Sequence, residues 1–128
     1  MSNYCYLRLE GKYVKVPFAQ IRFIEAHKNY PRIYLEEGSI LALITLKQLE
    51  HHLPPDLFCR IHRSYIVSLE HMTAFDARWV YLGEKALPLA RHYQKALHQK
   101  LLLLDVEPTP EMKVPFSLPI TSVKGGLN

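Results

Sequence analysis

The chain has 128 residues, of which 48% are hydrophobic, and its formal net charge is +4 with the histidines neutral. This length predicts one domain and is too short for two ordinary ones. No apolar run approaches the roughly 20 residues that a membrane-spanning helix needs. The N-terminus lacks the basic and apolar stretches of a secretion signal. We therefore expect a cytoplasmic protein in which Cys5 and Cys59 are reduced thiols.

The charge is unevenly distributed along the chain. Residues 1–104 contain 14 Lys or Arg against 9 Asp or Glu, whereas residues 105–128 contain 2 against 3. The basic excess therefore belongs to the expected folded part. It favours nucleic acid or another anionic partner, although many basic domains bind neither.

The first half of the chain is predicted to form short strands separated by tight polar turns. The expected strands cover residues 4–9, 13–16, 22–26, 32–36 and 39–44. The turns contain Glu10-Gly11-Lys12, the polar loop 27–31 and Glu37-Gly38. Pro17 ends the second strand, and residues 18–21 can form at most one helical turn.

The second half contains two expected helices. Thr45 can cap a short helix, since Leu46, Leu49 and Leu53 recur at helical spacing before Pro54-Pro55. Further extended segments are expected at 58–67, interrupted at His62-Arg63-Ser64, and at 74–76, 79–82 and 86–88.

A C-terminal helix is expected from Arg91, with Tyr93, Leu97, Leu101 and Leu104 on one face. Leu102 and Leu103 would make its end apolar nearly all round, so that either the tail or a second copy packs there. Residues 105–128 contain several prolines and no periodicity, which predicts an extended or disordered tail. Many short strands with one short helix between them indicate an all-β sandwich or barrel.

No catalytic constellation is visible in the sequence. His51 and His52 are adjacent, so their side chains diverge, and Cys59 and His62 lie on opposite faces of an extended strand. Ser64 lacks the flanking glycines of a nucleophile elbow. We expect no enzyme, no cofactor and no metal site; a hydrolase or metal enzyme would instead carry metal or depend on a titrating histidine.

Basic and hydrogen-bonding residues are expected to gather at loops between strands. The three sets are Lys28, Asn29, Tyr30 and Arg32; Arg60, His62, Arg63 and Ser64; and Arg91, His92 and Lys95. Arg and Asn can form two hydrogen bonds with a base edge in the major groove, and Lys suits phosphate. The alternative is that these residues are solvated loop charges, and residue chemistry alone does not decide between the two.

The segment Phe58–Val67, FCRIHRSYIV, resembles the F-x-R-x-H-R-S-Y-I-V signature of the LytTR DNA-binding domain family, found mostly at the C-terminus of bacterial response regulators. Other segments agree in order and spacing over about residues 4–104. These are GKYVKVP at 11–17, IRFIEA at 21–26, TLKQLE at 45–50 and LPLARHY at 87–93. Two departures are Ser68, where the family commonly has Asn, and Ala90, where it usually has Ser.

The resemblance implies a mostly β fold, an elongated stack of short antiparallel sheets with one short internal helix and a C-terminal helix. It implies a bacterial transcriptional regulator that contacts double-stranded DNA through loops: the 28–32 loop, Arg63 and Arg91. These coincide with the three basic sets. Repeated half-sites, a homodimer on DNA, and a receiver domain or sensor partner outside this chain are also expected. The main alternative is a β-sandwich that binds a protein partner and not DNA.

Overall fold

The computed structural model describes residues 3–106. Its elements in chain order are β1 (Tyr4–Leu9), β2 (Lys12–Pro17), a 3-10 turn (Phe18–Gln20), β3 (Ile21–His27), β4 (Tyr30–Leu35), β5 (Ser39–Leu41), α1 (Leu46–His52), β6 (Phe58–His62), β7 (Tyr65–Ser68), β8 (Ala74–Phe75), β9 (Trp79–Leu82), β10 (Lys85–Pro88) and α2 (Arg91–Gln99).

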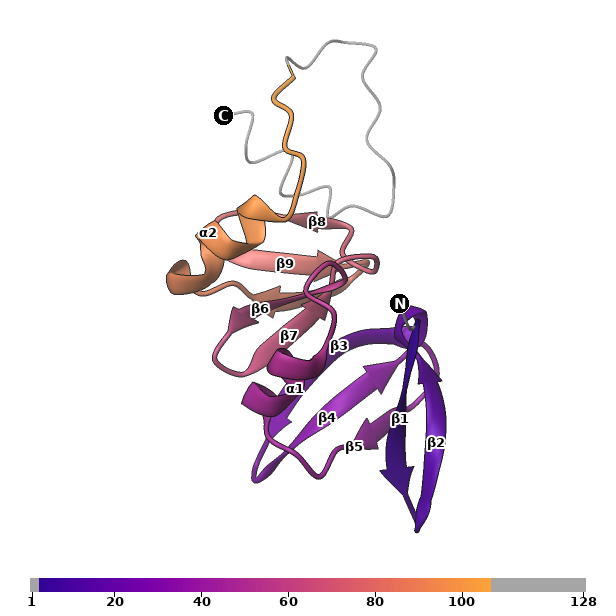
Figure 1. The fold of residues 1–128 in the computed structure, drawn as a ribbon. Helices are drawn as coiled ribbons and strands as arrows, with labels where there is room; N and C mark the ends of the chain where they lie inside the picture. The colour runs from indigo at the N-terminus through magenta and orange to yellow at the C-terminus, as the bar shows by residue number, and fades with distance from the viewer. Residues whose placement is uncertain (1–2, 107–128) are drawn as a thin grey trace.

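The strands form three antiparallel sheets arranged as an elongated stack (Figure 1). The central sheet has five strands in the order β5-β4-β3-β7-β6. The β1–β2 hairpin lies toward one end of the molecule, and the sheet β10-β9-β8 lies with α2 toward the other. The expected fold class is therefore confirmed, and the hairpins were correctly placed in the sequence.

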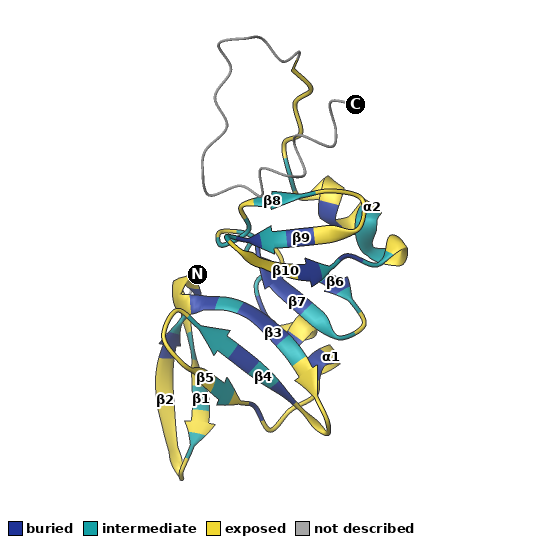
Figure 2. Ribbon diagram, turned by 180° about the vertical axis from the view of Figure 1, so that it is seen from behind, coloured by how far each residue is buried: buried dark blue, intermediate teal, exposed yellow. Residues whose placement is uncertain are grey.

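Both faces of the central sheet are buried, which gives the protein two cores (Figure 2). Successive side chains of a strand point to opposite faces. Ile24 and Ile66 accordingly enter a core shared with the hairpin and α1, while Phe23 and Val67 enter a second core shared with the three-stranded sheet and α2. In strands that are covered on both faces, neighbouring residues are both apolar, and apolar and polar residues do not alternate.

Local sequence explains the turns and the start of α1. Glu10 and Gly11 both have positive φ, as the tight turn between β1 and β2 requires. The Thr45 side chain accepts a hydrogen bond from the Gln48 backbone N–H, and the Gln48 side chain accepts one from the Thr45 N–H. This reciprocal cap satisfies two N–H groups that an α-helix leaves free.

Two expected elements are shorter in the structure. β5 ends at Leu41 rather than continuing to Ile44. α2 ends at Gln99, before Leu101 and Leu104, so the predicted extent of the helix was wrong. Leu101 still packs against the second core, whereas Leu104 is 74% exposed. The Lys100 ammonium donates to the carbonyls of Pro55 and Phe58, which anchors the end of the helix to the start of β6. The predicted tail, apart from residues 105 and 106, lies outside the described residues.

Replacing Leu97 should show that α2 is held by the second core. Leu97 is fully buried, so Leu97→Ala should lower the free energy of unfolding by about 2–5 kcal/mol through lost burial and a residual cavity. Leu102 is 86% exposed, and Leu102→Ala is the matched control, with a change near zero. Urea unfolding monitored by circular dichroism measures both. Equal losses for the two variants would contradict the observed end of α2.

Candidate nucleic-acid interface

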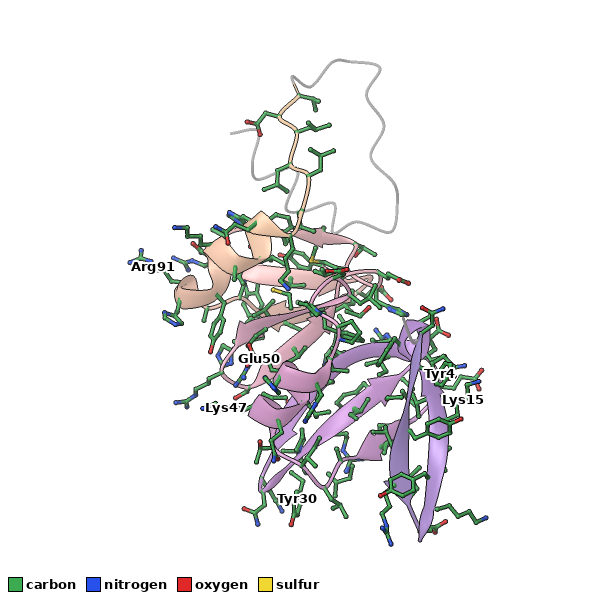
Figure 3. The ribbon with its side chains drawn as sticks, viewed as in Figure 1. Tyr4, Lys15, Tyr30, Lys47, Glu50 and Arg91 are labelled. Atoms are coloured by element: carbon green, nitrogen blue, oxygen red, sulfur yellow. The ribbon has the colours of Figure 1, made fainter. Side chains whose placement is uncertain are left out.

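Three turns lie along one edge of the stack because of how the strands pair. β3 and β6 end at the same edge where β4 and β7 begin. The Ala26 N–H donates to the Ser64 carbonyl at 2.8 Å, which joins the end of β3 to the β6–β7 turn. The Ala90 N–H donates to the Ile61 carbonyl at 2.9 Å, which joins the start of α2 to the end of β6. These bonds bring all three predicted basic sets to one edge (Figures 1 and 3).

The β3–β4 turn presents Lys28 and Asn29 to solvent. It is tighter than the expected loop, since His27 pairs directly with Tyr30. Lys28 has a φ of 53°, a left-handed conformation that costs free energy for a residue other than glycine. Tyr30 begins β4 and keeps 43% of its surface exposed.

Arg32 lies within β4 and not in a loop, which corrects the expected position. Its side chain is half-buried, and its guanidinium donates to Ser39 Oγ at 3.1 Å. Glu25 faces it across the β3–β4 ladder. Arg32 therefore projects less freely than Lys28 or Asn29.

The β6–β7 turn is held by two residues of its own signature. The Arg60 guanidinium donates to the carbonyls of His62 and Arg63 and pairs with the Glu50 carboxylate on α1 at 2.7 Å. His62 Nδ1 accepts a hydrogen bond from the Ser64 N–H at 3.0 Å. Arg63, at the tip, is exposed. The Arg60 guanidinium and the Nδ1 atom of His62 thus bond within the chain, and Arg63 projects outward.

The start of α2 concentrates positive charge at a helix N-terminus. Arg91 and His92 occupy the first turn with no acidic residue, and Ala90 at the N-cap offers no side-chain hydrogen bond. Backbone N–H groups there carry a partial positive charge that disfavours cations. Lys95 is exposed one turn after Arg91, on the same side of the helix. Cations at this end of the helix destabilise the isolated helix, and the same cations would attract an anionic partner.

Glu25 connects the two turns beneath the exposed residues. Its carboxylate accepts hydrogen bonds from the hydroxyls of Tyr65, at 2.9 Å, and Tyr34, at 3.2 Å. The Phe23 ring stacks on Tyr34 with centroids 4.4 Å apart. The cluster links β3, β4 and β7 close to where these strands meet the interface. Partial removal of Tyr65 from water, together with the hydrogen bond from its hydroxyl to Glu25, raises the pKa of Tyr65 to about 12.

Sequence reasoning missed four residues of this region. Glu25, Tyr34 and Tyr65 form the supporting cluster, and Lys47 on α1 is an exposed cation between Tyr30 and Arg91 along the same edge (Figure 3). A glutamate inside an apolar strand was an available signal, since a carboxylate that is even partly buried needs hydrogen-bond donors. Nothing in the sequence placed Lys47 beside the three turns.

The two departures from the family signature have local consequences. Ser68 is buried, and its hydroxyl lies 3.1 Å from His71 Nδ1, while His71 Nε2 lies 3.3 Å from Glu36. Ser68 therefore retains a polar partner where the family commonly has Asn. Ala90 leaves α2 without a side-chain cap.

Other kinds of site are weakly represented among residues 3–106. No three His, Cys, Asp or Glu side chains there gather as metal ligands. Neither α1 nor α2 has the length and hydropathy needed to cross a bilayer. Burial raises the pKa of the free Cys59 thiol, which disfavours the thiolate.

Cationic turns along one edge of a stacked β fold form a surface suited to an anionic partner such as nucleic acid. The family described as "LytTr DNA-binding domain" matches residues 11–102, and the chain belongs to this family. The expected DNA-binding domain is confirmed at this level, against the alternative of a protein-interaction module without DNA binding.

Two relatives agree with this assignment. The chain is 41% identical over 63 residues to the CO-responsive transcriptional regulator RcoM of Rhodospirillum rubrum; the match covers 49% of this chain and 27% of that protein. The structure resembles the LytTr DNA-binding domain of a putative methyl-accepting/DNA response regulator from Bacillus cereus, with a TM-score of 0.66 and 23% identity. That comparison covers 78% of this chain and 97% of the other, and it shows the shared fold.

The Glu25 cluster predicts a loss of stability at alkaline pH. In the folded chain Tyr65 keeps its proton up to about pH 12, whereas an unfolded tyrosine loses it near pH 10. Between these values the unfolded state binds fewer protons, so the free energy of unfolding falls as pH rises. Urea unfolding at pH 9 and pH 11 should show a smaller fall for Tyr65→Phe than for the unmodified chain. Identical falls would mean that folding does not raise the pKa of Tyr65.

Proposed function

We propose that this chain binds specific double-stranded DNA sequences with the edge formed by the β3–β4 turn, the β6–β7 turn and the start of α2. The observation that carries this proposal is the pair of backbone hydrogen bonds, Ala26 to Ser64 and Ala90 to Ile61, which align the three turns. The cationic side chains and those assigned to base reading therefore face in one direction, although they belong to three separate turns.

The outer turns are assigned to base reading and the central one to the backbone. Asn29 and Tyr30 would enter one major groove, and Arg91 would enter the next and contact guanine with both ends of its guanidinium. Arg63 would lie between them, near the phosphates or the minor groove. Insertion of turns into successive grooves favours DNA that bends, so part of the specificity comes from deformable base steps.

The remaining predicted residues divide into phosphate ligands and positioning residues. Lys28, Lys47, Lys95 and His92 are exposed along the edge and suit phosphate contacts. Arg32, Arg60 and His62 use polar atoms within the chain, and we assign them to holding the turns in place. Their replacement would disturb binding through turn geometry.

The biological setting of the domain is part of the proposal. We infer a bacterial transcriptional regulator that recognises repeated half-sites and is switched by a receiver or sensor region outside this chain. The CO response in the name of the RcoM relative belongs to that protein, of which this chain matches about a quarter.

The Arg91→Ala variant should distinguish a contact that reads a base from general electrostatic attraction between the protein and DNA. The binding site is first obtained by selection from random duplex pools with the full chain. Loss of a two-bond guanine contact should cost about 1–3 kcal/mol in a gel-shift titration and relax the preference at one base position. On a duplex that binds a single copy, Lys15→Ala is the matched cationic control, because Lys15 lies on the far side of the molecule (Figure 3). No enrichment of any sequence, or equal effects of both variants, would contradict the assignment.

Salt dependence should reveal the phosphate contacts. If about five phosphates are neutralised, log affinity should fall with log salt concentration at a slope of roughly −4 to −5. Lys95→Ala should weaken binding to all duplexes alike and make the slope shallower by about one. Fluorescence anisotropy with a labelled duplex at several salt concentrations measures both quantities. A slope near zero would rule out binding through this cationic edge.

A further inference from the structure

An exposed apolar segment follows α2 at one end of the molecule. Leu102, Leu104 and Val106 are 86%, 74% and 72% exposed, and Asp105 stands among them. Side chains of this kind are stabilised when they are removed from water. The segment continues beyond the three-stranded sheet at the end opposite the β1–β2 hairpin (Figure 1).

An apolar groove lies at the other end. It has a volume of about 330 Å³ and lies between the β1–β2 hairpin and the chain that leads from β5 to α1. Tyr6, Tyr13 and Leu43 line it and are 55%, 66% and 67% exposed. Tyrosine side chains with aliphatic neighbours are typical of the centres of protein interfaces.

The hairpin beside the groove is positively charged. Arg8 lies over the Tyr13 ring, 5.6 Å from its centroid, and Lys15 lies over Tyr4 at 4.1 Å. Among the described residues neither cation forms a salt bridge; the two that are formed there join Arg60 to Glu50 and His71 to Glu36. An occupant with a carboxylate next to aliphatic side chains would complement this end. The segment from Leu102 to Val106, with Asp105, has that composition.

The segment and the groove of one copy lie at opposite ends of the long axis, and the cationic edge runs along that axis (Figures 1 and 3). We propose that the Leu102–Val106 segment docks in the groove of a second copy bound to the neighbouring DNA site in the same orientation. This inference rests on the proposed function, because DNA aligns the two copies. The contact is head-to-tail and does not close, so it can extend along further tandem sites.

A second copy fits the observations better than other occupants. Aliphatic side chains such as Leu43 offer nothing to a nucleic acid strand, which favours a protein segment. DNA holds two copies close together and supplies the high effective concentration that a small contact needs. The contact would therefore appear as cooperative binding to DNA with little self-association in its absence.

The test compares duplexes that carry one selected site, two sites in the same orientation, or two in opposite orientations. Gel-shift titration with the full chain should show the second copy binding about tenfold more tightly than the first, only on the same-orientation duplex. A spacer altered by about five base pairs rotates one copy by half a helical turn and should abolish this gain without changing single-site affinity.

Two variants locate the contact without touching the DNA edge. Leu102→Ser/Leu104→Ser removes the apolar segment, and Leu43→Glu places an acid in the groove, where it repels Asp105. All three positions are at least 67% exposed, so folding should be retained, as urea unfolding can verify. Each variant alone should lose the tenfold gain and keep its single-site affinity. An equal mixture of the two variants should recover the tenfold gain. The contact can form when the Leu43→Glu copy places its intact segment in the intact groove of the Leu102→Ser/Leu104→Ser copy.

The outcomes separate this inference from the proposed function. Failure to bind any single site would refute the proposed function itself. Normal single-site binding with equal affinity for both sites in every orientation would overturn only the head-to-tail contact. Cooperativity that survives both variants, or a mixture that fails to recover it, would also overturn the contact and point to another surface or occupant.

Discussion

The pairing of β3 with β7 is the constraint on which the interface depends. It places the end of β3 beside the β6–β7 turn, where the Ala26 N–H reaches the Ser64 carbonyl. The same sheet supplies the Ile61 carbonyl that receives the Ala90 N–H before α2. These main-chain bonds lie outside the strand ladders and join the three turns to one another at the edge of a doubly covered sheet. A rigid spacing is what successive grooves of DNA require of a loop-based reader.

Several local features of the cationic edge are unfavourable for folding, and the proposed DNA binding accounts for them. Lys28 adopts a left-handed φ, and α2 begins with two basic residues and no cap. Each feature costs stability in the isolated chain, and the two cores on either side of the central sheet offset that cost. The interface is thus built from strained or uncompensated positions on a well-packed support.

Beneath this surface, side chains that bond within the chain hold the turns that carry the exposed ones. Arg60 joins α1 to the β6–β7 turn through Glu50, and Glu25 joins β3 to β4 and β7 through two tyrosines. Some signature residues of the family therefore project into solvent, and others hold the turns in place by bonds within the chain. Arg63 and Arg60 stand three residues apart and have opposite roles, since one is exposed and the other is bonded within the chain.

The sequence by itself determined the strands, the turns, the cap of α1 and the three basic sets, because these depend on local periodicity and turn chemistry. It also determined the family, through the segment Phe58–Val67. Only the tertiary structure decided where α2 ends, since the apolar periodicity runs to Leu104, whereas the second core extends to Leu101 and leaves Leu104 exposed. The tertiary structure also decided that Arg60 and Arg32 turn back into the chain and that Lys47 joins the edge. These outcomes depend on contacts between residues distant in sequence, which no local pattern records.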